Sequence, residues 1–486
     1  MGAPLAFLIC SVVVAGLFFF DRDKSVRSSK ALWLPVIWIW IAGSRSVSSW
    51  FGVAGPSSGG VLAATLDGSP LDALIFEFLI AAGVVVLFQR GKKTTALLRV
   101  IVPVLIYFLY CMLSTTWSPI HGPAFKRWIK GVGDLVMVLL IATDAHPVAA
   151  LRRLYSRVGF VLLPFSVVLI RYSDLGRAYD PSGDPMNTGV TTNKNTLGLI
   201  VFVISLGALW NVRALLFDRR VLHRTRRLVT QGTLLVLGIS LLQMAHSATC
   251  IFCFILGSGL MLALGLRTIR KRPSRVQALC LGILLTGALT VLFGGQSLVT
   301  GALGRDSTFT GRTDIWKASI ATAENPLIGT GFESFWNVNV DRVALALSNI
   351  WGIHDLNSAH NGYIQIYLDL GLVGLCLLSI VLISGYRRAG RAAQRDPEFG
   401  RLILPYLVTM TFYSITEAGF RILTPSWIFL LLAVVCANGI ASGVVRGKNP
   451  KIPAARGGRT NRADALNRLI PEREVPYSAA LLNSVQ

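Results

Sequence analysis

The chain has 486 residues, of which 53% are apolar and only 15% are charged, whereas a typical soluble chain carries about 25% charged residues. This composition excludes a soluble enzyme, a disordered chain and a collagen-like chain. It also excludes a transmembrane β-barrel, because the apolar runs are long and continuous rather than alternating. The sequence therefore predicts an all-α polytopic membrane protein.

The apolar runs predict about 13 transmembrane helices within a membrane domain that covers residues 1–445. The run at residues 3–20 has no basic residue before it and is followed by Asp21-Arg22-Asp23-Lys24. This charge pattern is the reverse of that in a signal peptide, so we expect a retained first helix with its N-terminus outside. In chain order, the runs lie near residues 3–20, 31–43, 71–88, 97–113, 129–142, 158–170, 196–211, 229–245, 249–266, 276–294, 361–384, 402–417 and 425–445.

The formal net charge is +23, and its distribution indicates topology rather than nucleic-acid binding. Alternate connections between the apolar runs, together with the C-terminal tail, hold 35 of the 47 lysines and arginines. The positive-inside rule assigns these connections to the cytoplasm. The tail, residues 446–486, is basic and rich in Pro and Gly, so we expect it to be disordered and held near anionic lipid headgroups.

Two connections on the opposite, outside face are long enough to have structure of their own. The first, residues 171–195, is rich in Asp, Gly, Pro, Asn and Thr, and the second covers residues 295–360. We expect the second to form a structured loop that covers the outer ends of the membrane helices.

The pattern within the longer loop predicts two helices. The first covers residues 312–323 and ends at Asn325-Pro326, because a residue before proline avoids the α region. A tight turn at Gly329–Gly331 follows, and apolar residues then recur at helical spacing over 332–347. This second helix could lie on the membrane–water interface, or it could pack against the membrane helices.

Two residues of this loop could carry chemistry. His360, followed by Asn361, stands where the chain re-enters the membrane, and a histidine there can accept a proton from a hydroxyl. Alternatively, it could simply bond to the backbone at a helix end. Arg312 offers a planar fork of donors that suits phosphate oxygens, or it could pair with Asp306 or Asp314.

The shorter loop offers further basic and polar side chains. Arg171, Arg177 and Lys194 lie in or beside it, and Asn195 follows directly. Cations from two separate loops are what a bound diphosphate would need. The alternative is that these residues are solvated loop charges.

Three carboxylates, Glu77, Asp134 and Asp369, fall inside apolar runs, where an ionisable residue suggests a functional role. They could equally pair with arginines at helix ends.

His354, Asp355 and His360 could suggest a metal site, but no further ligands stand at suitable spacing, so a metal site is not expected. Cys250 and Cys253 have no partner pair, which disfavours a metal or redox role. The chain also lacks the glycine-rich motifs of nucleotide sites and a paired D-x-D, so we expect any transferase here not to use a soluble nucleotide donor. We expect no cofactor.

Four short motifs occur in order along the predicted outside face. They are Asn193-Lys194-Asn195-Thr196-Leu197-Gly198, Gly311-Arg312-Thr313-Asp314-Ile315-Trp316, Pro326-Leu327-Ile328-Gly329-Thr330-Gly331, and His360-Asn361 followed after nine residues by Gly371-Leu372-Val373-Gly374. Together they resemble the bacterial O-antigen ligase and exopolysaccharide polymerase family, and the first is similar to a segment of its polymerase branch. One position departs from that branch, because Thr188 stands before Gly189 where an arginine is usual. The nearest arginines are Arg177 and then Arg171.

The resemblance implies a glycosyltransferase of the bacterial inner membrane that works at the periplasmic face without a metal and with inversion. Its donor would be an oligosaccharide on undecaprenyl diphosphate, and its acceptor a sugar hydroxyl of a glycan. His360 would act as the base and Arg312 would stabilise the diphosphate, since arginines can offset charge on a leaving group. Arg171, Arg177, Lys194, Asn195 and Asn361 would contact substrate. Export or chain-length proteins are possible partners, and nucleic acid is not.

Three functions remain open at this point. The Lys194-Asn195 segment favours a polymerase of exopolysaccharide or O-antigen repeat units. A ligase that passes finished glycan to lipid A core or to protein would use the same donor chemistry. A transporter or flippase of lipid-linked sugar is the third possibility, although its polar residues should gather near the bilayer midplane rather than on outer loops.

Overall fold

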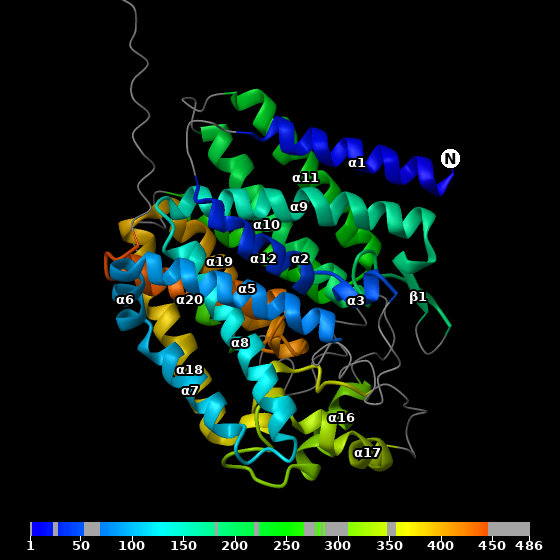
Figure 1. The fold of residues 1–486 in the computed structure, drawn as a ribbon, viewed down its shortest axis with the longest axis vertical. Coiled ribbons are helices and arrows are strands. Elements are labelled where there is room, and N and C mark those ends of the chain that lie inside the picture. Colours follow the sequence, from blue (N-terminus) through cyan, green and yellow to red (C-terminus); the bar gives the residue numbers. More distant parts are fainter. Residues whose placement is uncertain are drawn as a thin grey trace, which may run out of the picture. The chain divides into compact units, whose positions relative to one another are not determined.

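The computed structural model describes residues 2–22, 28–52, 69–179, 183–217, 223–266, 310–347 and 356–445, together with short stretches within 278–286. The predicted tail at 446–486 and most of the apolar run near 276–294 lie outside these residues. The described elements (Figure 1) are the helices α1 (Ala3–Phe20), α2 (Trp33–Ala42), α3 (Val47–Trp50), α5 (Pro70–Gln89), α6 (Gly91–Val100), α7 (Val102–Ser114), α8 (His121–Ala142), α9 (Pro147–Tyr172), α10 (Lys194–Phe217), α11 (Arg224–Ala245), α12 (Ala248–Ala263), α16 (Thr310–Thr322), α17 (Phe335–Leu347), α18 (Gly362–Arg395), α19 (Pro397–Thr416) and α20 (Pro425–Ala441), the short 3-10 turns η1 (Lys30–Leu32) and η2 (Asp174–Gly176), and the strands β1 (Arg177–Tyr179) and β2 (Pro185–Asn187).

The described chain is helical and multi-pass, but the number of 13 spans is not confirmed. Six helices are long and apolar enough to cross a membrane: α1, α5, α9, α10, α11 and α18. The pair α6 and α7, bent by 83° at its break, would make a seventh. Three further apolar segments, Lys30–Ala42, Ala248–Ala263 and Pro425–Ala441, are shorter than a bilayer-spanning helix normally is.

Burial separates an inner group of helices from an outer group. In α20 every residue from Pro425 to Ile440 is buried, as expected for a helix that is apolar on all sides and surrounded by others. In α1 only 17% of the apolar window is buried, and Leu8 and Val12 are 62% and 65% exposed. Because large apolar side chains are not left in water on this scale, the outer surface of α1 is suited to lipid.

Close helix contacts depend on glycines at two positions in the core. A Cβ on Gly207 of α10 would lie 2.4 Å from the ring of Tyr155 on α9. A Cβ on Gly133 of α8 would lie 2.2 Å from the ring of Trp38 on α2. Small residues at such points let helices approach closely, as is common in membrane proteins.

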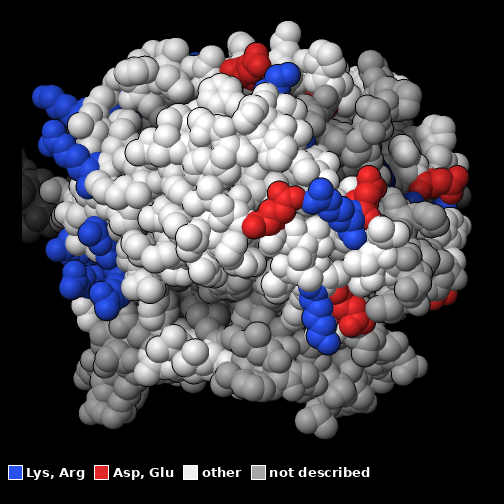
Figure 2. Space-filling model, turned by 90° about the horizontal axis from the view of Figure 1, so that it is seen from below, with Lys and Arg blue, Asp and Glu red and all other residues white. Residues whose placement is uncertain are grey.

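Charged side chains gather at the two ends of the helices. Figure 2 shows a broad face without charged residues. Only Lys and Arg lie at its left, the side on which Figure 1 places α6, and acidic and basic residues are mixed toward the right. We call the end with α6 and the C-terminal part of α18 the basic end. There Arg395 of α18 donates from Nη1 to the carbonyl oxygen of Ile440 on α20 at 3.3 Å. We call the end with α16 and α17 the roof end.

The described part of the longer loop, which we call the roof, forms two helices, as the sequence predicts. Helix α16 covers nearly the expected residues 312–323, and α17 forms within the expected 332–347. The apolar side of α17 packs against α16 and the start of α18, which favours the packed alternative for this helix. The buried apolar residues of this roof core are Trp316, Phe335, Trp336, Val343, Leu347, Ala359 and Leu368.

Two of the glycine motifs bond to each other. The backbone N–H of Gly331 donates to the carbonyl oxygen of Asp369 at 2.8 Å, and that of Val373 donates to Leu327 at 3.1 Å. Gly371 interrupts α18 with a φ of +66°, and a Cβ there would lie 2.2 Å from the Leu327 oxygen. Only glycine permits both this backbone conformation and this approach, so the motifs join the roof to a break in α18.

Within residues 171–195, two short strands form a small hairpin, which the sequence did not predict. Strands β1 and β2 pair antiparallel. Arg45, from the connection after α2, braces the loop by donating from Nη2 to the carbonyl oxygen of Leu175 at 2.6 Å and from Nη1 to that of Gly189 at 3.3 Å. An arginine from another part of the chain thus reaches the backbone beside Thr188.

Candidate active site

Four polar side chains from distant parts of the chain meet at the roof end. Glu417 Oε1 accepts from Arg312 Nη2 at 3.0 Å and from Asn195 Nδ2 at 3.0 Å. Glu417 Oε2 lies 3.3 Å from Nδ1 of His360. We call these four residues the Glu417 cluster. The structure therefore brings together three of the predicted site residues, around a carboxylate that the sequence analysis missed.

Glu417 lies in the connection between α19 and α20, and its side chain is only 10% exposed. Burial raises the pKa of this carboxyl, but the charge of Arg312 and the hydrogen bond from His360 outweigh burial and lower the pKa below its ordinary value. The group is therefore a carboxylate at neutral pH. In the sequence it is the last residue of an apolar run, with no motif around it, so only its position at a helix end could have drawn attention to it.

The backbone places His360 directly before α18. Its φ of +46° is unusual for a residue with a side chain. Asn361 caps the helix, since its Oδ1 accepts from the backbone N–H groups of Tyr363 at 2.9 Å and Ile364 at 3.1 Å. Its Nδ2 donates to the Ile415 carbonyl oxygen at 2.9 Å, which ties α18 to the end of α19. The amide of Asn361 therefore holds the fold, and the His360 ring, 37% exposed, is accessible.

Arg312 reaches the cluster from the first turn of α16. Its Nη1 donates to the carbonyl oxygen of Thr416, and its side chain is 19% exposed. Trp316, one turn later, donates from Nε1 to the Ala359 oxygen at 2.7 Å, which holds α16 against the segment before the histidine. The sequence suggested that Arg312 could pair with Asp306 or Asp314. In the structure Arg312 does form an ion pair, but its partner is Glu417.

Asn195 enters from the start of α10. Its Oδ1 accepts from Ser247 Oγ at 3.1 Å, so the amide is fixed from two sides. Its carbonyl oxygen lies 3.7 Å from Sγ of Cys250, and both Cys250 and Cys253 are buried free thiols. The preceding Lys194 is half-buried and forms no ion pair within the described residues.

A second buried ion pair holds the connection that carries the cluster carboxylate. Arg421 Nε lies 3.1 Å from Glu333 Oε2, and these side chains are 11% and 6% exposed. Glu333 Oε1 also accepts from the backbone N–H of Ile422 at 3.3 Å, and Asp134 Oδ2 accepts from that of Leu423 at 3.0 Å. Buried charges of this kind are stable only when paired and hydrogen-bonded, so the connection is anchored to both α8 and the roof.

The intramembrane carboxylates consequently differ in role. Asp134 supports the α19–α20 connection, and Asp369 Oδ1 accepts from the backbone N–H groups of Ser334 at 3.0 Å and Phe335 at 2.9 Å. Both are buried and satisfied by the fold. Glu77 is exposed on the outer surface of α5 and contacts none of the cluster residues. None of the three lies in the Glu417 cluster.

Arg171 and Arg177 lie apart from the cluster. Arg177 is on β1, 46% exposed, with its Nη2 3.3 Å from Oδ1 of Asp174. Arg171 is exposed in the last turn of α9. The hairpin packs near α11, where Asn187 Nδ2 donates to the Met244 carbonyl oxygen at 2.9 Å. No contact joins either arginine to the Glu417 cluster in the described part of the chain, so their contact with substrate stays a prediction.

Within the described residues, no group of three or more His, Cys, Asp or Glu side chains could hold a metal ion. His354 and Asp355 lie outside those residues. The structure thus leaves the expected absence of a metal as a prediction.

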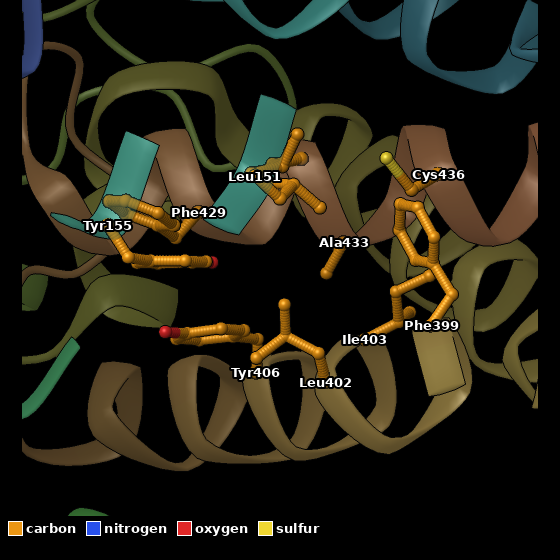
Figure 3. Close-up of a pocket in the computed structure, with 10 residues that line it drawn as sticks. Leu151, Tyr155, Phe399, Leu402, Ile403, Tyr406, Phe429, Ala433 and Cys436 are labelled. Atoms are coloured by element: carbon orange, nitrogen blue, oxygen red, sulfur yellow. The ribbon is translucent and has the colours of Figure 1, made fainter. Parts of the chain in front are cut away.

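A separate cavity lies between α9, α19 and α20 (Figure 3). Tyr155 and Tyr406, two of its lining residues, stack with their ring centroids 5.9 Å apart. No residue of the Glu417 cluster lines it, and it offers no cation for a diphosphate. It is lined by Leu151, Tyr155, Phe399, Leu402, Ile403, Tyr406, Phe429, Leu432, Ala433 and Cys436.

Comparison with known proteins gives two matches. Residues 233–379 match the protein family described as O-antigen ligase, a stretch that includes Arg312 and His360 but not Glu417. The chain is also 26% identical over 307 residues to the exopolysaccharide production protein ExoQ of Rhizobium meliloti (strain 1021), which covers 60% of this chain and 66% of that relative. The chain thus spans just under two thirds of the relative it matches. These matches confirm the resemblance to the O-antigen ligase family, with the exopolysaccharide protein as a distant homologue.

Proposed function

We propose that this membrane protein is a glycosyltransferase that moves a glycan from an undecaprenyl-diphosphate carrier to a sugar hydroxyl, and that it polymerises exopolysaccharide or O-antigen repeat units. The observation that carries the proposal is the Glu417 cluster, in which a histidine and an arginine share one carboxylate at the end of the membrane helices. A lipid-linked diphosphate lies at that level of a bilayer. The relative is named an exopolysaccharide production protein and the matching family is described as O-antigen ligase, which supports a role in joining bacterial glycans.

In this proposal His360 is the general base. With Nδ1 bonded to the Glu417 carboxylate, the neutral ring carries its proton on Nδ1 and leaves Nε2 to accept a proton. The acceptor hydroxyl gives its proton to Nε2, and its oxygen forms a bond to the anomeric carbon of the donor. The bond from that carbon to the diphosphate oxygen breaks on the opposite face, and the electron pair leaves with the diphosphate. The anomeric configuration is inverted.

Arg312 is the group that offsets the charge of the leaving diphosphate. Its guanidinium is bonded to the same carboxylate as the base, so a diphosphate that contacts it holds the anomeric carbon close to His360. Arginine provides two parallel donors for phosphate oxygens, which is why the proposal needs no metal. Lys194 and Asn195 at the start of α10, Arg171 in the last turn of α9 and Arg177 on β1 are the further proposed substrate contacts. Asn361 was also expected to contact substrate, but both polar atoms of its amide are bonded within the fold.

The orientation belongs to the proposal as well. The basic end holds the connections that the positive-inside rule assigns to the cytoplasm. The roof end would then face the periplasm of a bacterial inner membrane, where lipid-linked glycans are assembled after they cross it.

The experiment is deletion of the gene, followed by analysis of lipid-linked glycans and secreted polysaccharide. A polymerase predicts that single lipid-linked repeat units accumulate and that high-molecular-weight polysaccharide disappears. Complementation with wild type must restore the polymer, while His360→Ala at equal protein level must not. Repeat units that stay on the cytoplasmic side would instead indicate a flippase and contradict the proposal.

A ligase is the second candidate, because the matching family is described as O-antigen ligase. It predicts that long glycan chains still form on the undecaprenyl carrier in the deletion strain but are not transferred further. The length of the carrier-bound glycan therefore distinguishes the two candidates.

A further inference from the structure

Three arginines from three helices surround one carboxylate at the basic end. Arg152 Nη2 of α9 lies 3.3 Å from Glu398 Oε1. Arg401 Nη1 of α19 and Arg213 Nη1 of α10 lie 3.0 and 3.5 Å from Glu398 Oε2. We call these four residues the Glu398 site. It lies at the opposite end of the helices from the Glu417 cluster.

The guanidinium groups of this site are partly buried and held in place. The side chains of Arg152, Arg213 and Arg401 are 19%, 12% and 13% exposed. Arg152 lies over the ring of Trp210 at 5.0 Å, and Arg213 over that of Phe217 at 5.2 Å. Stacking on an aromatic face leaves the N–H edge of a guanidinium available in the plane of the group. The site is therefore organised before any ligand arrives.

The positive charge of the site exceeds what Glu398 can neutralise. If the carboxylate is assigned to Arg152, two guanidinium charges remain, and neither Arg213 nor Arg401 has an ion pair with another carboxylate in the described part of the chain. The Nε of Arg401 is buried without a hydrogen-bond partner. Clustered like charges in a partly buried place are unfavourable unless an anion is near.

The chain segment that follows α12 has no acidic residue that could supply that anion. A Cβ on Gly265, at the end of α12, would lie 3.3 Å from Arg213 Nη2. The chain continues from there into residues 267–275, which contain five lysines and arginines and no acidic residue. A topology signal needs only basic residues in connections. It does not require guanidinium groups that converge on one carboxylate and stack on aromatic rings.

We propose that the Glu398 site binds a phosphate group, presented by the headgroup of an anionic phospholipid at the basic end of the helices. Basic pockets between membrane helices are suited to such headgroups, and arginine forks match phosphate oxygens in pairs. The phosphate displaces Glu398 in part and bridges Arg213 and Arg401. This proposal does not depend on the glycosyltransferase reaction.

The test uses the purified full-length protein in a neutral detergent, with thermal unfolding followed by tryptophan fluorescence during titration with lipid. Phosphatidylglycerol should raise the Tm of wild type, because a ligand that binds only the folded state stabilises it. Phosphatidylcholine, which has no net charge, should not. Arg213→Gln and Arg401→Gln should each raise the half-effective lipid concentration about tenfold or more, as expected for the loss of a charged hydrogen bond.

Two further variants separate binding from general damage. Arg387→Gln removes one positive charge from an exposed residue at the same end and should respond to lipid like wild type. Glu398→Gln removes the competing carboxylate and should lower the half-effective concentration, a change that a damaged fold would not produce.

The outcomes distinguish the source of the phosphate. If inorganic phosphate alone stabilises wild type but not Arg213→Gln, the site binds the free anion and the phosphate chemistry is supported without the lipid. The proposal is overturned if phosphatidylcholine acts like phosphatidylglycerol. It is equally overturned if Arg213→Gln, Arg401→Gln and Arg387→Gln all respond alike.

Discussion

Replacement of Glu417 by glutamine tests whether the Glu417 cluster is catalytic machinery. Glutamine keeps the size of the side chain and one oxygen that can accept from Arg312 or Asn195, but it removes the charge. In wild type the carboxylate is 10% exposed and its arginine partner 19%, so water screens the pair only weakly. Loss of one partner of a buried pair costs about 3–5 kcal/mol. We expect Glu417→Gln to be destabilised by an amount at the lower end of this range, because the amide retains hydrogen bonds.

The effect on catalysis should be larger than the effect on folding. Without the carboxylate, nothing in the cluster holds the His360 proton on Nδ1, and Nε2 is no longer reliably free to accept the acceptor proton. Loss of a carboxylate behind a catalytic imidazole lowers turnover by up to about 10⁴. We expect Glu417→Gln to lower kcat by about 10²–10⁴. The assay is glycan transfer from a synthetic lipid-diphosphate donor in detergent, at matched concentrations of folded protein.

The chain offers a matched control in the pair formed by Glu324 and Arg342 on the roof. Their side chains are 65% and 64% exposed, with Arg342 Nη1 2.5 Å from Glu324 Oε1. An exposed pair contributes about 0–1 kcal/mol, so Glu324→Gln should leave both Tm and kcat near wild type. If Glu417→Gln turns over like wild type, or if the two variants lose activity equally, the role assigned to Glu417 is wrong.

Four further predictions follow from the same geometry. His360→Ala should lower kcat by about 10²–10⁴, and Arg312→Lys should lose most activity because an ammonium group lacks the bidentate fork; glycan transfer by each variant, at equal protein level, is the measurement. The pKa of Glu417 is lowered from 4.5 in the folded protein. Its carboxylate therefore contributes to stability above about pH 4.5, and this contribution disappears as the pH falls through the lower, folded-state pKa. The difference in Tm between wild type and Glu417→Gln should shrink below pH 4.5, and a constant difference would contradict this. Transfer activity should survive EDTA, and its loss on chelation with recovery on added metal would show that a metal takes part. In a background without other reactive thiols, an outside-only maleimide should label Thr192→Cys and not Lys93→Cys, both exposed positions; the reverse pattern would invert the orientation.

Local and periodic features of the sequence determined the class of the protein and much of the roof. Apolar runs separated by basic connections predict membrane helices because the bilayer selects for both. The helix before Asn325-Pro326 was predictable because proline constrains the residue before it, and Gly329 and Gly331 adopt the positive φ that glycine permits. The number of membrane spans could not be predicted in the same way. Several apolar helices are shorter than a bilayer requires or carry charge, so whether each one crosses the membrane depends on the helices packed around it.

Only the tertiary structure decided which carboxylate completes the site. Glu417 is separated from His360 by 57 residues, from Arg312 by 105 and from Asn195 by 222. It has no motif, and its selection depends on where the ends of α10, α16, α18 and α19 meet. Asp134 and Asp369 drew attention in the sequence as carboxylates in apolar runs, yet both accept backbone hydrogen bonds that hold the roof and the α19–α20 connection. The role of a buried carboxylate, in stabilising the fold or in orienting a base, depends on the groups that contact it in the folded protein. Sequence spacing does not specify those groups.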